Sequence, residues 1–194
     1  MKKMKRTLLV LIGLTLLIPD KTKAQDHEIQ TNMLGIFINN YSISYERLLK
    51  DKGWFSNVEY FVNPKSFNYD YTAFAFNTEY RFYFNSKKAE GIFAGPYLNY
   101  RYTSAPDFGN FSNLNPESSI EVEQTSSGIA LGLITGKKWV HSSGFVYGTY
   151  VGVGRYLFES VTYSNNYEPS DDQDDFDELP AFNLRFGLAI GYRF

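Results

Sequence analysis

Seven charged side chains stand at alternate positions in segments whose other positions are large and apolar. They are Glu46, Glu59, Glu79, Arg81, Arg101, Arg185 and Arg193. A buried charge without a partner is costly, so we expect these carboxylates and guanidinium groups to form compensating pairs. Such a set can line a gated polar channel, or it can form a solid, salt-bridged plug. The elements that carry the charges decide between the two.

A second group that could do chemistry is the pair His141 and Ser143, which are separated by one residue. A histidine can act as a base that activates a serine hydroxyl for nucleophilic attack. The other histidine, His27, lies near the opposite end of the chain. The chain has no cysteine, which excludes disulfides and thiolate metal sites.

The third group is the acidic segment from Tyr167 to Leu179, which holds seven carboxylates in thirteen residues. Such a density is compatible with calcium or magnesium ions that bridge to phosphate groups, but no glycine occupies the sharp-turn position of an EF-hand loop. A solvated loop is therefore the favoured interpretation. We assign no catalytic, cofactor-binding or metal-binding residue, and no cofactor, from the sequence.

These residues are carried by segments with a period of two. The clearest runs from Phe182 to Phe194, where seven large apolar residues alternate with six small, polar or charged ones. Strict alternation indicates a strand with two opposite faces. Arg185 and Arg193 lie on the face opposite the apolar one. A strand of about 9 to 11 residues can cross a membrane, and an apolar outer face with a polar lumen is typical of a transmembrane barrel.

Seven further segments show similar alternation. They cover residues 28–38, 41–49, 54–62, 72–84, 92–103, 120–140 and 145–158. Eight strands leave both chain ends on one side, with short turns there and the long loops 104–118 and 159–179 opposite, as expected for an outer-membrane barrel. We expect these two loops to be exposed and poorly ordered. The two-residue connection 39–40 breaks the asymmetry, and Pro96 predicts an irregular stretch in the fifth strand.

The N-terminal residues have the features of a secretory signal peptide. Lys2, Lys3, Lys5 and Arg6 precede an uncharged run from Thr7 to Ile18, and a polar segment then leads to the small-residue cleavage site at Ala24. We predict a signal peptide over residues 1–24, cut after Ala24, and one barrel domain over residues 25–194. The mature chain then has 13 basic against 20 acidic side chains, a net charge near -7, so we expect no nucleic-acid partner.

The alternating strands and the terminal Phe194 resemble the small eight-stranded outer-membrane barrels of the OmpX and OmpA-barrel type. The resemblance implies an all-β fold, an eight-stranded antiparallel up-and-down transmembrane β-barrel, in the outer membrane of a Gram-negative cell. It also implies that the barrel assembly machinery recognises Phe194. Alternation alone does not distinguish this barrel from a soluble lipocalin-type barrel, whose apolar face would point inward.

The function that we expect is a structural or surface-interaction role through the external loops, without catalysis. An eight-stranded barrel encloses just enough space for side chains, which favours the plug over a narrow channel. The alternative of a lipid A-modifying enzyme arises because the spacing of His141 and Ser143 resembles that of lipid A deacylase barrels, although this turn would lie on the periplasmic side. The expected partners are outer-membrane lipids and lipopolysaccharide, and we expect a monomer.

Overall fold

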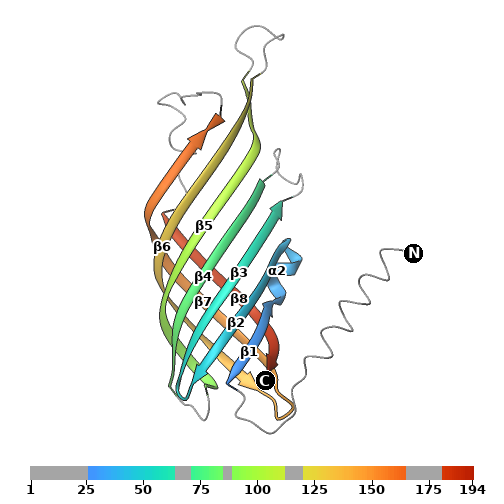
Figure 1. Cartoon of the computed structure of the whole chain (residues 1–194), viewed down its shortest axis with the longest axis vertical. Helices are drawn as coiled ribbons and strands as arrows, with labels where there is room; N and C mark the ends of the chain where they lie inside the picture. Colours follow the sequence, from blue (N-terminus) through green and yellow to red (C-terminus); the bar gives the residue numbers. More distant parts are fainter. Residues whose placement is uncertain (1–25, 64–70, 85–88, 112–119, 165–180) are drawn as a thin grey trace, which may run out of the picture.

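The computed structural model describes residues 26–63, 71–84, 89–111, 120–164 and 181–194. In this part of the chain eight strands form a closed barrel in which each strand pairs antiparallel with the next and β8 returns to β1 (Figure 1). The strands are β1 His27–Asn32, β2 Asn40–Leu49, β3 Lys52–Asn63, β4 Tyr71–Tyr83, β5 Gly91–Phe111, β6 Ile120–Val140, β7 Phe145–Tyr163 and β8 Phe182–Arg193. The prediction of an all-β, up-and-down barrel of eight antiparallel strands is confirmed.

The two faces of each strand lie in different environments. On β8, Leu184 and Phe186 are 70% and 61% exposed, whereas their neighbours Asn183 and Arg185 are 7% and 8% exposed. The charged face therefore points into the barrel and the apolar face points outward, which is the opposite of a lipocalin-type arrangement. No helix among the described residues is long and apolar enough to span a membrane.

The first predicted strand is too long, because β1 ends at Asn32 and a short helix, α2 (Met33–Phe37), follows it. Asn32 begins the helix, and its side-chain oxygen accepts a hydrogen bond from the Leu34 N–H. The five residues of the helix are Met, Leu, Gly, Ile and Phe, a run without alternation. The first connection is consequently longer than the two residues 39–40 that we predicted.

The loop predicted over 104–118 is wrong in its first half, and the loop predicted over 159–179 begins too early. β5 continues to Phe111 and pairs with β6, with a register irregularity between Ala105 and Gly109. Pro106 falls in this irregular stretch, where its missing N–H removes a ladder bond. β7 continues to Tyr163 and also pairs with β6. Pairing with a long neighbour determines these strand ends more than local composition does.

The barrel wall has a tall and a low side, which Figure 1 shows. β5, β6 and β7 contain 21, 21 and 19 residues, while β2, β3, β4 and β8 contain 10 to 13. The end that carries His27, Phe194 and the β6–β7 turn is called the lower end here, and the opposite end is called the upper end. The tall strands project beyond the rest at the upper end.

Candidate functional site

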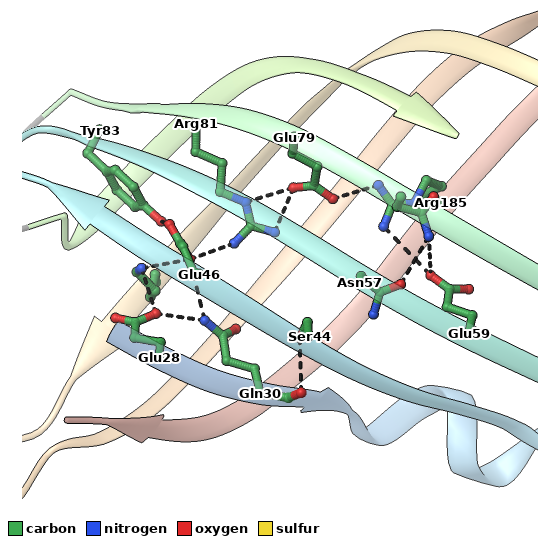
Figure 2. Close-up of polar contacts among 12 residues, drawn as sticks. Glu28, Gln30, Ser44, Glu46, Asn57, Glu59, Glu79, Arg81, Tyr83 and Arg185 are labelled. Atoms are coloured by element: carbon green, nitrogen blue, oxygen red, sulfur yellow. Dashed lines mark hydrogen bonds and ion pairs between the residues drawn. The ribbon is translucent and has the colours of Figure 1, made fainter. Parts of the chain in front are cut away.

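The interior of the barrel holds a continuous line of four carboxylates and four cations with alternating sign, most of which Figure 2 shows. In order from the lower end they are Arg193, Glu28, Lys138, Glu46, Arg81, Glu79, Arg185 and Glu59. The successive N···O distances lie between 2.5 and 3.1 Å, except the last, from Arg185 Nη2 to Glu59 Oε1, which is 3.7 Å. We call this set the charge line.

The charge line connects strands on different sides of the bore. Its members come from β1, β2, β3, β4, β6 and β8. Glu28 and Glu46 are completely buried, and Lys138 is 2% exposed. Buried ions are tolerated when each is paired and hydrogen-bonded, and the equal numbers of acids and bases leave this interior neutral. The lower half of the bore is thus closed by paired charges.

Aromatic rings complete the filling of the lower half. The Arg81 guanidinium lies 3.6 Å from the centre of the Phe55 ring and 4.6 Å from that of Phe93. The Lys138 ammonium lies 4.6 Å from the centre of the Tyr83 ring, and the Tyr83 hydroxyl donates a hydrogen bond to Glu46. Cations that lose water are stabilised by the faces of such rings. The lower bore therefore contains a packed plug of paired charges and aromatic rings.

A group of asparagine side chains lies above the plug. The Asn77 amide donates to Asn57 and to Glu59, at 3.0 Å in each case, and the Asn99 amide donates to Asn77 at 2.7 Å. Asn183 donates to Asn99 at 3.3 Å and accepts from the Tyr97 hydroxyl at 2.9 Å. These neutral amides link β3, β4, β5 and β8 across the bore.

Two cavities adjoin the upper end of the charge line, with volumes of about 170 and 160 Å³. The residues common to both are Asn40, Glu59, Leu184 and Arg185. The first cavity extends into the bore toward Asn99 and Arg101, and the second extends beneath α2 toward Tyr150 and Phe186. The upper half of the bore is therefore less completely filled than the lower half.

Comparison with known proteins gives a family and no activity. A family described as proteins of unknown function, DUF3575, matches residues 8–193. The chain belongs to this family. Neither a curated protein nor a solved structure matches the chain. The family match and the closed barrel both fit a small β-barrel protein. Further evidence about the function of this DUF3575 protein comes from the interior of its barrel.

The predicted pairing of interior charges is confirmed for six of the seven residues. Glu46, Glu59, Glu79, Arg81, Arg185 and Arg193 all belong to the charge line. Arg101 is placed elsewhere, on the wall of the first cavity. These charges were therefore correctly assigned to the interior face. The strands bring them together from distant parts of the sequence.

Two members of the charge line, Glu28 and Lys138, were missed. Glu28 lies on the same face of β1 as Gln30, whose amide donates to it at 2.7 Å. Lys138 follows Lys137, and consecutive strand residues point to opposite faces. Lys138 continues the inward face of Ala130 and Ile134, which are both buried. The period of two could have identified both residues.

His141 and Ser143 do approach each other, in the turn between β6 and β7. His141 Nδ1 lies 2.9 Å from Ser143 Oγ and also accepts the Ser143 backbone N–H at 3.3 Å. Both contacts join residues two apart, and the turn is exposed at the lower end. A contact of this kind stabilises the turn. A catalytic role for His141 and Ser143 stays the alternative function that the sequence suggests.

The acidic segment from Tyr167 to Leu179 lies outside the described residues, as does the predicted signal peptide over 1–24. Within the described ranges, no group of three or more histidine, aspartate or glutamate side chains is placed to hold a metal ion. A solvated acidic loop stays a prediction, and cation binding stays its alternative.

Proposed function

We propose that this protein is an outer-membrane β-barrel with a closed bore, which acts through the part of its sheet that projects beyond the membrane. The observation that carries the proposal is the inverted distribution of residues. Large apolar side chains such as Leu133 and Leu184 are 68% and 70% exposed, while the charges are inside. A bilayer solvates such an apolar outer surface, and in the closed barrel each strand pairs with its two neighbours.

The size of the low wall supports the same location. β3 and β8 each contain 12 residues. At about 3.3 Å per residue and a tilt of about 45°, such a strand spans roughly 28 Å, close to the ~25 Å apolar band of outer-membrane barrels. Exposed aromatic residues lie near both ends, as in interfacial aromatic girdles. They include Trp54, Phe82, Phe145 and Tyr147 at the lower end, and Tyr41, Tyr60, Phe158 and Phe182 at the upper end.

The projecting part of the tall wall is the surface that we propose for interaction. β5 pairs with β4 only as far as Ser104 and continues to Phe111. β7 pairs with β8 only as far as Arg155 and continues to Tyr163. Each extension pairs with β6 along one edge. A sheet that projects beyond the membrane offers a surface on a rigid scaffold, which supports a surface-interaction role.

The resemblance to OmpX and OmpA-type barrels becomes part of this proposal, together with contacts to outer-membrane lipids and lipopolysaccharide.

The terminal residue, Phe194, also contributes to closure of the barrel. The Phe194 and His27 backbones exchange hydrogen bonds of 2.8 and 3.2 Å, and the two rings stack with centres 6.0 Å apart. We propose that the assembly machinery recognises Phe194 at this closing pair.

Ion conduction and catalysis are not part of the proposal. A channel needs a continuous wet path, whereas the charge line and the rings of Phe55, Phe93 and Tyr83 fill the lower bore. Lipid A chemistry would take place in the outer leaflet, whereas His141 and Ser143 lie at the lower end, which we assign to the periplasm. The projecting sheet accounts for the tall strands without either activity.

Single cysteines can test the location and the orientation, because the chain has no native cysteine. Ser160 lies in the β7 extension and Ser142 lies in the β6–β7 turn, and both are exposed. We expect a membrane-impermeant maleimide to label Ser160→Cys on intact cells, and to label Ser142→Cys only after the outer membrane is permeabilised. Heat-modifiable migration on a gel verifies that each variant is folded.

The opposite labelling pattern would show that the proposed orientation is inverted. Equal labelling of both folded variants only after cell lysis would place the protein away from the outer surface. Planar-bilayer recordings on the same preparations should show no conductance, and a stable open channel would contradict the closed bore.

A further inference from the structure

The upper half of the barrel wall is interrupted between β2 and β8. β1 pairs with β8 only up to Asn32, opposite Ala189, and with β2 only up to Gln30, opposite Ser44. Above these points, residues 182–188 of β8 pair with β7 alone, and residues 40–43 of β2 pair with β3 alone. α2 lies at this interruption, as Figure 1 shows. We call the opening between β2 and β8 the seam.

Backbone groups of β8 point into the seam. The reciprocal bonds between Phe194 and His27 show that even-numbered residues of β8 direct their N–H and C=O groups toward β1. Higher on the strand, the Asn32 side chain replaces the missing strand partner, because it accepts from the Leu188 N–H at 3.1 Å and donates to the Phe186 carbonyl at 3.3 Å. Above Asn32, no described residue hydrogen-bonds to the Leu184 backbone on this side.

The two cavities beside the seam contact both faces of β8. They are lined by Arg185, which points into the barrel, and by Leu184, which points outward and is 70% exposed. At the interruption, residues of both faces of β8 adjoin the same cavities. Ile38 and Phe186, which are also largely exposed, line the second cavity. The seam therefore connects an apolar outer surface with a polar interior.

The inner end of this path has unused hydrogen-bonding capacity. Asn40 Oδ1 is buried and has no hydrogen-bond partner among the described residues. Arg185 Nη2 is 3.7 Å from Glu59, beyond hydrogen-bonding distance, while Arg185 Nη1 is held by Glu79 at 2.6 Å. A buried acceptor without a donor costs free energy, so a group that donates to Asn40 and accepts from Arg185 would be stabilised here.

We propose that the seam is a lateral binding site for an uncharged, single-chain amphiphile with a hydroxyl or amide head, which enters from the membrane. The head lies between Asn40, Glu59 and Arg185, and the hydrocarbon chain passes out over Leu184 and Phe186. Cavities of about 170 and 160 Å³ match the space that holds one benzene-sized group, which suits a small head and excludes a bulky one. This inference rests on the proposed membrane location.

The charges of the seam select an uncharged head. Among the lining residues of the second cavity, the ionised side chains are Glu59 and Arg185, one of each sign. An added carboxylate, phosphate or ammonium group would leave one uncompensated charge beside this balanced pair. A hydroxyl or amide both donates and accepts without disturbing this balance.

The experiment uses a monoacylglycerol that carries a diazirine next to its glycerol head. The full-length mature protein is irradiated with this probe in phosphatidylcholine vesicles and, separately, in detergent micelles. We expect labelling of the inward-facing residues Asn40 and Tyr150, which excess unlabelled monoacylglycerol abolishes. A fatty acid with the same chain and the same diazirine should label these residues less.

Two matched variants separate the seam from general lipid contact. Leu184→Trp places a large ring at the mouth of both cavities, whereas Leu133→Trp makes the same change at a similarly exposed, outward-facing position of β6. We expect labelling of Asn40 and Tyr150 to fall roughly tenfold in Leu184→Trp, because a head that cannot enter loses the one to two hydrogen bonds that it would make inside. It should be unchanged in Leu133→Trp.

Labelling confined to outward-facing residues, or equal labelling of Asn40 in the two tryptophan variants, would overturn the proposal. Stronger labelling by the fatty acid would overturn the uncharged head. If Leu184→Trp does not fold, competition in the wild-type protein decides: saturable labelling of Asn40 supports the site, and labelling that unlabelled monoacylglycerol cannot displace overturns it. The micelle experiment tests the seam without a bilayer, so its outcome does not depend on where the protein lies in the cell. The cysteine labelling on cells tests the membrane location.

Discussion

The lower and upper halves of the bore use the same residue types and differ in how completely those residues are paired. In the lower half, Glu46 contacts Lys138 and Arg81, each at 3.1 Å, and accepts the Tyr83 hydroxyl. In the upper half, Glu59 and Arg185 are 3.7 Å apart beside two cavities, and Asn40 Oδ1 has no partner among the described residues.

This difference separates a structural role from a binding role. A buried polar network that is completely satisfied rigidifies its surroundings, and its parts are strongly coupled. A network with an unpaired acceptor and a long ion pair has capacity that a ligand can use. The lower half of the bore therefore holds the barrel together, and the upper half offers a site.

The largest effect should follow from Glu46→Gln. This change removes one buried negative charge from a neutral interior and leaves Lys138 and Arg81 with one carboxylate each. Breaking a buried ion pair by removing one partner costs about 3–5 kcal/mol, and we expect a loss of that size in the free energy of unfolding. The measurement is the urea midpoint of the heat-modifiable folded band.

A double variant provides the control for this prediction. Glu46→Gln combined with Lys138→Gln restores equal numbers of acids and bases in the charge line. We expect the double variant to be more stable than Glu46→Gln alone. The loss of unfolding free energy in the double variant is compared with the sum of the losses in Glu46→Gln alone and Lys138→Gln alone. If the two single losses simply add, excess charge is not the cause of the destabilisation and packing must explain it.

An intermediate effect is expected for Gly35→Ala in α2. A Cβ atom at Gly35 would lie 2.4 Å from the Asn40 backbone oxygen, which cannot yield as a flexible side chain does. Alanine favours a helix over glycine by about 1 kcal/mol, but an overpacked contact costs about 1–3 kcal/mol, so the steric term should win. We expect α2 to move out of the seam while the barrel stays folded.

Amide hydrogen exchange measures this displacement directly. The Ile38 and Asn39 N–H groups donate to the Gly35 and Ile36 carbonyls, at 3.0 and 3.3 Å, and both should exchange faster in Gly35→Ala. The control is Ile36→Ala, a change at an exposed position of the same helix, which should leave exchange unchanged. Faster exchange in the control alone would mean that Gly35 does not hold α2 in the seam.

The barrel could be predicted from the sequence because a period of two determines both the strand and its two faces. In the segment from Phe182 to Phe194, the positions of Arg185 and Arg193 also identified the interior face. The same rule, continued from the inward-facing Ala130 and Ile134, places Lys138 inside and Lys137 outside, although the two adjacent lysines obscure the alternation. Lys138 is buried, and Lys137 lies against the Trp139 ring, 4.9 Å from its centre.

Features that depend on tertiary pairing were beyond prediction from local sequence. α2 forms where Asn32 supplies a cap and where β2 and β8 separate, and neither condition is visible in residues 33–37 alone. The ends of β5 and β7 depend on β6, whose length stabilises polar segments that resemble loops. The seam and its cavities arise from these departures, so alternation alone could not reveal them.

The smallest effect should follow from Glu59→Gln, the upper counterpart of Glu46→Gln. Glu59 is more exposed than Glu46, its contact with Arg185 is long, and Arg185 keeps Glu79 at 2.6 Å. The new amide group would face the Asn40 Nδ2 donor, which now binds Glu59 at 3.2 Å. Asn40 can rotate its amide, however, because its Oδ1 atom has no other partner among the described residues and can accept from the new amide.

The cost of this change should therefore be about 1 kcal/mol, the scale of one ordinary hydrogen bond, measured by the same urea midpoint. The ratio of the two effects is the informative quantity, because both variants replace a carboxylate by its amide within the same charge line. If Glu59→Gln destabilised the barrel as much as Glu46→Gln does, the upper half would be as tightly coupled as the lower half. The seam would then have no spare hydrogen-bonding capacity to offer a ligand.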